Sequence, residues 1–282
     1  MPQTPPHPRQ KGAAPDPETD RLAAELAAYA GSDAEYTQYR EADDEDLGPP
    51  PGLSEALAAL EASGTGAEER DGRRALGVPA ALIDDMAWLW RAQATLPERL
   101  ALAEGLWASG IHEAMLAAAK LLTQARLRPD EGAWALILGW APEFRGPATS
   151  DAACSAAGRR LLADPSRMAQ VAEWLDAPNP WTRRAALLAA LPFARLNHLG
   201  PEQAQARQIA LDWCARLSRD PDPRVVRAVE HWIRTLAKHG AEELQAWLAT
   251  RTDLPKGLRR AAEKGLGLAD GRVDKGAPWA SH

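Results

Sequence analysis

The side chains that could do chemistry in this chain are a scattered set of acidic, basic and aromatic residues between positions 107 and 238. The usual catalytic signatures are absent from the sequence. It has no Walker phosphate-binding loop, no dinucleotide-binding glycine pattern, no nucleophile elbow and no His-Glu-x-x-His zinc helix. The six histidines do not cluster at the spacing of metal ligands, so no metal site is indicated. Any chemistry must therefore come from a surface that brings distant residues together.

A motif that recurs with a 43-residue offset indicates how the fold positions these residues. Pro180-Trp181-Thr182-Arg183-Arg184-Ala185 is followed by Pro223-Arg224-Val225-Val226-Arg227-Ala228, and each motif opens an apolar helical run. Proline is tolerated in a first helical turn, and Arg184 and Arg227 then lie one turn in, on matching faces. An offset of this size is typical of HEAT-type repeats, which stack into a solenoid with a long concave binding surface.

The composition favours an all-α fold, because the apolar residues are mainly Ala and Leu, which favour helices, with very few Phe, Tyr or Ile. We expect a helical body with no β-sheet, and no stretch of about 18 apolar residues that could span a membrane. The apolar periodicity and the Gly, Pro, Asn and Asp breaks predict helices at roughly 53–62, 79–94, 97–108, 111–126, 130–143, 151–163, 167–176, 180–191, 202–218, 223–238, 241–249 and 255–266.

The aromatic and sulfur residues fit the interior of such a body. Eleven Trp stand against two Phe, and most of these Trp are expected to fill gaps between Ala-rich faces, with a minority free to stack on bases or sugars. Cys154 and Cys214 are too few for a disulfide framework, so we interpret them as buried, reduced thiols in a cytoplasmic protein.

The net charge of -6 hides an asymmetry along the chain. Residues 1–70 hold 15 acidic and 5 basic residues, whereas the remainder holds 24 acidic and 28 basic residues. We expect a disordered, Pro-rich acidic leader at 1–51, a HEAT-like domain at 52–270 and a flexible tail at 271–282. A weakly basic body is compatible with binding a polyanion.

Several short segments between about residues 76 and 266 resemble the AlkD-type DNA alkylation repair glycosylases, a family with HEAT-like repeats. The segments that carry the resemblance are Gly77-Val78, Leu106-Trp107-Ala108-Ser109, His112-Glu113, Asp151, Leu161-Leu162-Ala163-Asp164-Pro165, Trp174, Asn179 through Ala186, Arg227-Ala228-Val229, Trp232-Ile233-Arg234 and Ala237-Lys238. Their order and spacing together carry the likeness.

The resemblance implies a DNA glycosylase that excises cationic N3- or N7-alkylated purines from duplex DNA, without metal or cofactor. Asp151 matches the family's catalytic aspartate, and Arg184 and Arg234 match two phosphate-holding arginines. Such a leaving base is already cationic, so a carboxylate held against the sugar can stabilise the charge that develops as the base departs. By itself Asp151 would be an ordinary acid at a helix start, and each arginine a surface ion-pair partner.

The chain departs from the family pattern at two positions that carry tryptophan there. Pro147 and His231 stand in their place, and Trp140 and Trp232 are near enough in sequence to substitute. The residues expected to contact DNA are Arg183, Arg184, Arg227, Arg234, Trp181, Trp232 and His231.

Two functional hypotheses follow. The first is a monomeric, cytoplasmic glycosylase that acts on duplex DNA and has no membrane partner. The second is a non-catalytic HEAT scaffold that binds DNA or a protein. Asp151 discriminates between them: a carboxylate beside a basic groove supports the enzyme, and one turned to bulk solvent supports the scaffold.

Overall fold

The computed structural model describes residues 47–268, and these residues belong to one compact unit. Residues 47–52 have no regular structure and lead into the first described helix. The expected leader, apart from its last five residues, and the expected tail at 271–282 lie outside the described residues.

The described part of the chain is a succession of helices with short connections, which confirms the predicted all-α solenoid class. In chain order they are α3 (Leu53–Ser63), α4 (Ala80–Gln93), α5 (Leu96–Ala108), α6 (His112–Leu121), α7 (Glu131–Trp140), α8 (Pro147–Ala163), α9 (Met168–Val171), α10 (Pro180–Ala189), α11 (Leu191–Arg195), α12 (Pro201–Leu217), α13 (Pro223–His239), α14 (Ala241–Thr250) and α15 (Lys256–Gly265). Short 3-10 segments follow α7 and flank α9. No described helix meets the length and apolarity that crossing a bilayer requires.

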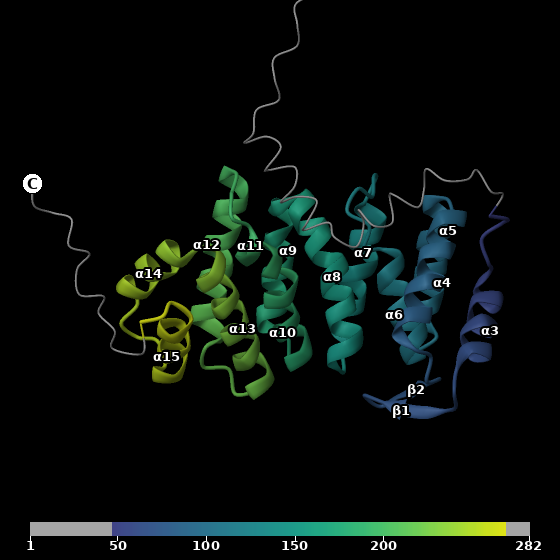
Figure 1. Ribbon diagram of the computed structural model, residues 1–282, viewed down its shortest axis with the longest axis horizontal. Helices are drawn as coiled ribbons and strands as arrows, with labels where there is room; N and C mark the ends of the chain where they lie inside the picture. Colours follow the sequence, from purple (N-terminus) through teal and green to yellow (C-terminus); the bar gives the residue numbers. More distant parts are fainter. Residues whose placement is uncertain (1–46, 269–282) are drawn as a thin grey trace, which may run out of the picture. The chain divides into compact units, whose positions relative to one another are not determined.

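The helices form two layers. In one layer α6, α8, α10, α13 and α15 pack side by side in a row. In the other, α5 packs on α6, α7 on α8, the 3-10 segment Ala172–Asp176 on α10, and α12 and α14 on α13. Figure 1 shows α8, α10 and α13 as neighbours across the middle of this body. Each layer thus buries its apolar side against the other, as in stacked helical repeats.

Polar contacts between successive repeats recur at nearly constant sequence separation. Arg167 pairs with Asp130 at 2.7 Å, and Arg183 binds Asp220 through two hydrogen bonds of 2.7 and 2.9 Å; both pairs are 37 residues apart. Arg160, which is fully buried, donates to the carbonyl oxygens of residues 124, 125 and 127 in the preceding repeat. These bonds fix the register of each helix pair on the next.

The starts of α10 and α13 explain why the repeated motif could be recognised. Asn179 accepts a hydrogen bond from the Trp181 amide at 3.0 Å, and Asp222 accepts one from the Arg224 amide at 2.8 Å. Each is an N-cap followed by Pro in the first turn. The two helices therefore begin in the same way and pack against each other.

One expectation about the fold is wrong, because the described residues contain a small antiparallel sheet. Strands β1 (Glu68–Arg70) and β2 (Arg73–Ala75) pair around Asp71 and Gly72, whose φ angles are 55° and 70°. Asp-Gly is a preferred dipeptide for a two-residue hairpin with both φ angles positive. The hairpin is anchored because buried Glu113 accepts the backbone amides of the two residues after β2, at 2.8 and 2.9 Å.

Most tryptophans pack in the interior, as expected. Those that are less than a tenth exposed are Trp90, Trp107, Trp134, Trp140, Trp174, Trp213, Trp232 and Trp247. Trp107 and Trp140 stack with ring centroids 4.2 Å apart. Cys154 and Cys214 are buried free thiols, and burial raises the pKa of both.

The ion pair between Arg167 and Asp130 predicts a specific acid sensitivity. The hydrogen bond from Arg167 lowers the pKa of Asp130, so this pair stabilises the fold above the unfolded carboxyl pKa of about 3.9. The contribution is lost as the pH falls through the lower folded value. In urea unfolding at pH 7, 5, 4 and 3, Asp130→Asn should be less stable than the parent at pH 7 and should lose less further stability on acidification. Parallel pH profiles for the two proteins would contradict this role.

Candidate functional site

The site is built from three neighbouring helices of one layer, each of which begins with proline. Each of these helices carries a charged residue four positions after its first proline. These residues are Asp151 after Pro147, Arg184 after Pro180 and Arg227 after Pro223. Equal offsets in parallel-packed helices place these side chains on equivalent faces. We call the surface that carries Asp151, Arg184, Arg227, His231 and Arg234 the α8–α10–α13 face.

The carboxylate at the centre of this face is held by an arginine from the next helix. Arg184 binds both oxygens of Asp151: one Nη donates to Oδ1 and the other to Oδ2, the latter at 3.1 Å. The Asp151 side chain stays 47 % exposed, whereas that of Arg184 is 16 % exposed. Asp151 is thus oriented from one side by a nearly buried cation and open to a ligand on the other.

The position of Asp151 within its helix differs from the expected one. Helix α8 begins at Pro147, with Gly146 as N-cap, and not at residue 151. Asp151 therefore lies in the second turn, and it is not the capping acid that its sequence context suggested. The carboxylate is thus free to serve the α8–α10–α13 face.

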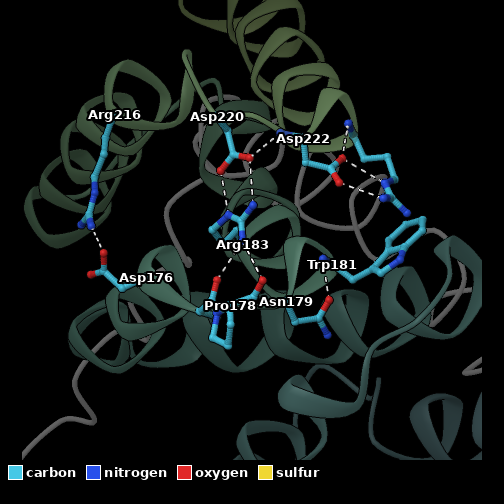
Figure 2. Close-up of polar contacts among 10 residues, drawn as sticks. Asp176, Pro178, Asn179, Trp181, Arg183, Arg216, Asp220 and Asp222 are labelled. Carbon is cyan, nitrogen blue, oxygen red and sulfur yellow. Dashed lines mark hydrogen bonds and ion pairs between the residues drawn. The ribbon is translucent and has the colours of Figure 1, made fainter.

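Trp181 flanks the Asp151–Arg184 pair and is enclosed by cations. The guanidinium carbon of Arg184 lies 5.4 Å from the Trp181 ring centre, and that of Arg224 lies 5.0 Å from it. Asp222 in turn binds the Arg224 guanidinium at 2.8 and 2.9 Å, an arrangement visible in Figure 2. Trp181 is half-buried, and cation–π contacts fix its ring beside the pair.

On α13, His231, Arg234 and Arg227 are exposed. Partial burial and then the charges of Arg195, Arg234 and Arg184 lower the pKa of His231, while Asp151 opposes the shift. This set of influences places His231 within electrostatic range of the carboxylate and its arginine. Arg234 is 52 % exposed and lies 3.6 Å from Glu230, a contact loose enough to leave its charge available.

Trp232, one of the residues expected to contact DNA, lies in the core instead. Trp232 is fully buried, and its indole N–H donates to the carbonyl of Ala190 at 3.4 Å. It lies one position past the exposed His231, so the helix turns it into the core. Trp140 is buried as well and cannot replace a surface tryptophan.

Arg183 was also expected to contact DNA, and its guanidinium is engaged within the protein. Besides both oxygens of Asp220, its guanidinium binds the carbonyls of Ala177 and Pro178 at 2.9 and 3.1 Å, as Figure 2 shows. Its donors are committed to joining α10 to the start of α13. Its neighbour Arg184 points to the α8–α10–α13 face, because adjacent residues project about 100° apart on a helix.

Sequence reasoning missed Arg195, which ends α11 and is exposed beside His231. No motif marks it, because α11 is a five-residue helix in a stretch with no readable periodicity. The start of α8 at Pro147 could have been predicted from the sequence. The spacing from Pro147 to Asp151 equals the spacing from Pro180 to Arg184. Within residues 47–268, no three His, Cys, Asp or Glu side chains are grouped as metal ligands.

Comparison with known proteins identifies the fold and the family. The family model described as DNA alkylation repair enzyme matches residues 54–266. The chain is similar to the crystal structure of AlkD2 from Streptococcus mutans, with a TM-score of 0.55 and 16 % identity over 79 % of this chain and 100 % of that one. It is also similar to the crystal structure of smu.31 from Streptococcus mutans UA159, with a TM-score of 0.54 and the same identity and coverage. No curated protein sequence matches the chain. Since the family model spans most of its length, the chain belongs to the DNA alkylation repair enzyme family.

Proposed function

We propose that this protein is a DNA glycosylase that excises cationic N3- or N7-alkylated purines from duplex DNA, with Asp151 as its catalytic carboxylate. It would act as a monomer in the cytoplasm, without metal or cofactor. The observation that carries the proposal is the Asp151–Arg184 pair, in which a half-exposed carboxylate is held by two hydrogen bonds beside His231 and Arg234. Membership of a DNA alkylation repair family supports DNA as the substrate.

The reaction requires the protein to place one negative charge against the deoxyribose. An alkylated purine already carries positive charge, so when the bond between C1′ and the base nitrogen breaks, the electron pair neutralises the departing base. Positive charge then develops on the deoxyribose, and a fixed carboxylate against that sugar stabilises it. A water molecule adds to C1′ from the carboxylate side and releases one proton to solvent, which leaves an abasic sugar and a neutral free base.

Arg184 reduces the electrostatic repulsion between the Asp151 carboxylate and the DNA phosphates. A lone carboxylate would repel the phosphates on either side of the target sugar, whereas the Asp151–Arg184 pair has no net charge. The two hydrogen bonds also fix the direction of the carboxylate before the sugar becomes cationic, so no reorganisation is needed in the transition state. Arg184 is therefore assigned mainly to positioning Asp151, and Arg234 and Arg227 to holding phosphates.

If Arg234 holds a DNA phosphate, its removal should change how the affinity for DNA depends on salt concentration. Arg234→Ala should reduce the slope of log affinity against log salt for undamaged duplex DNA by about one, because one phosphate contact is lost. Arg184→Ala should change the slope less, since its charge is already balanced by Asp151. Fluorescence anisotropy titrations at salt concentrations from about 50 to 300 mM would measure the slopes of both variants.

Arg216→Ala provides the matched control. Arg216 lies on α12 in the other layer, is half-exposed and pairs with Asp176. Its loss removes the same charge and should leave the slope unaltered. An unchanged slope for Arg234→Ala, or an equal loss for the control, would remove Arg234 from the DNA interface. Salt-dependent DNA binding without release of any base would favour the scaffold hypothesis.

A further inference from the structure

We propose that Arg195, Lys238 and His239 form a second phosphate-binding site, which holds the DNA backbone beside the Asp151 site and takes up a proton when DNA binds. This inference rests on the proposed function, because the ligand is the backbone of the same duplex.

The three residues come together where α11 and the C-terminal end of α13 meet. Helix α11 packs against α13, and Arg195 is its last residue. Two residues further on, Asn197 Oδ1 lies 2.9 Å from His239 Nδ1, so the end of α11 is joined to the end of α13. Arg195, Lys238 and His239 are all exposed.

The site continues the α8–α10–α13 face along α13. His231 and His239 are eight residues apart, which corresponds to about 12 Å along a helix, or roughly three to four nucleotide steps of duplex DNA. Arg195 influences both histidines more strongly than any other charged residue does. Because α11 packs against α13, Arg195 lies alongside α13 within electrostatic range of both histidines, where a strand that passes the Asp151 site would continue.

The backbone that carries Arg195 is held rigidly by a buried arginine. The Arg207 guanidinium donates to the carbonyl of Phe193 at 2.7 Å and to that of Leu196, the residues that bracket the end of α11. Its own charge is balanced by Glu243 of α14 at 2.9 Å. Arg207 is 3 % exposed, so these contacts belong to the interior of the fold, and we call them the Arg207 clamp.

Arg195 and Lys238 are two exposed cations at this site. Neither forms an ion pair with any of residues 47–268, and both lie close enough to His239 to influence its charge. Cations that are held near one another on an ordered surface without an acidic partner favour an anionic ligand. A phosphodiester supplies that charge, and the held backbone at the end of α11 fixes the position from which the Arg195 side chain reaches it.

His239 makes the site distinguishable from a simple cationic patch. Partial burial, and then Arg195, Arg207 and Lys238, lower the pKa of His239, which favours its neutral form in the free protein. The acidic group that faces this cluster is Glu243, through Arg207. A bound phosphate would oppose the neighbouring cations and raise the pKa of His239. Binding should then draw a proton from solution, and affinity should increase as the pH falls from about 8 to 6.

Calorimetric titration of the full chain with an undamaged duplex, in two buffers of different ionisation enthalpy at pH 7, measures this proton uptake. We expect a fraction of one proton per complex, and a smaller uptake for His239→Gln. His231→Gln, measured in parallel, separates the contribution of the Asp151 site. Arg195→Gln should reduce the salt slope by about one. Arg216→Gln, on α12 in the other layer, is the matched control and should change neither quantity.

The outcomes separate this inference from the proposed function. If the duplex binds but uptake is unchanged in His239→Gln and the salt slope is unchanged in Arg195→Gln, the second site is wrong and the glycosylase proposal is unaffected. A lower slope without a change in uptake would overturn the proton coupling. If no duplex binds at any salt concentration, both proposals fail.

Discussion

Asp151→Asn is expected to slow the release of alkylated purine by about 10²–10³-fold, or roughly 3–4 kcal/mol in the activation barrier. Asparagine keeps the shape of the side chain and one acceptor for Arg184, but it removes the negative charge that opposes the cationic sugar. Affinity for damaged DNA should barely change, because that sugar charge exists only in the transition state. It should increase slightly, if at all, because Arg184 loses its counterion and becomes free to attract phosphate.

Single-turnover release of N7-methylguanine from a duplex, together with anisotropy binding to the same duplex, would measure these two effects separately. Asp176→Asn is a suitable control, because Asp176 is an exposed carboxylate that pairs with an arginine outside the α8–α10–α13 face. The control should release base at the parent rate. Equal rates for Asp151→Asn and the parent would show that Asp151 is not the catalytic carboxylate.

Trp232→Ala is expected to destabilise the protein by about 3–5 kcal/mol, because it removes a fully buried indole from the centre of α13. The hydrogen bond from its indole N–H to Ala190 is lost as well. Trp181→Ala removes a half-buried ring from the α8–α10–α13 face, and its cost in stability should be clearly smaller. Urea unfolding of the two variants would measure the difference.

The two tryptophans should also differ in their effect on DNA binding. At temperatures where both variants are folded, Trp232→Ala should bind duplex DNA like the parent. Trp181→Ala should bind more weakly, because it removes a half-buried ring of the α8–α10–α13 face that is expected to contact DNA. If Trp232→Ala bound DNA more weakly without any loss of stability, Trp232 would belong to the DNA interface.

The helical fold was predictable because its signals are local. Pro at the start of α10 and α13, the caps Asn179 and Asp222, and apolar periodicity all act within a few residues of the element that they define. The hairpin at 68–75 was missed, although Asp71-Gly72 is a local turn signal, because the flanking strands are three residues each and have no apolar alternation. Their stability comes from Glu113, which lies some 40 residues further along the chain.

The site was only partly predictable, because exposure depends on helix rotation and on contacts between repeats. His231 and Trp232 are adjacent in sequence, yet one is exposed and the other buried, and only the packing of α13 on its neighbours decides which. Arg183 and Arg184 differ in the same way: the first is bound to Asp220 of the next repeat, and the second to Asp151 of the previous one. Arg195 depends on the clamp by Arg207, which no local pattern reveals.

The central claim is that this protein breaks the bond between the sugar and a cationic purine, and base release tests it most directly. Purified full-length protein would be incubated in excess with duplexes containing N7-methylguanine or N3-methyladenine, and free base would be separated chromatographically over time. An undamaged duplex and a protein-free reaction provide the background of spontaneous loss. We expect release of free methylated base well above that background, with no release from undamaged DNA and no requirement for added metal. Binding to all three duplexes with base loss at the spontaneous rate would contradict it.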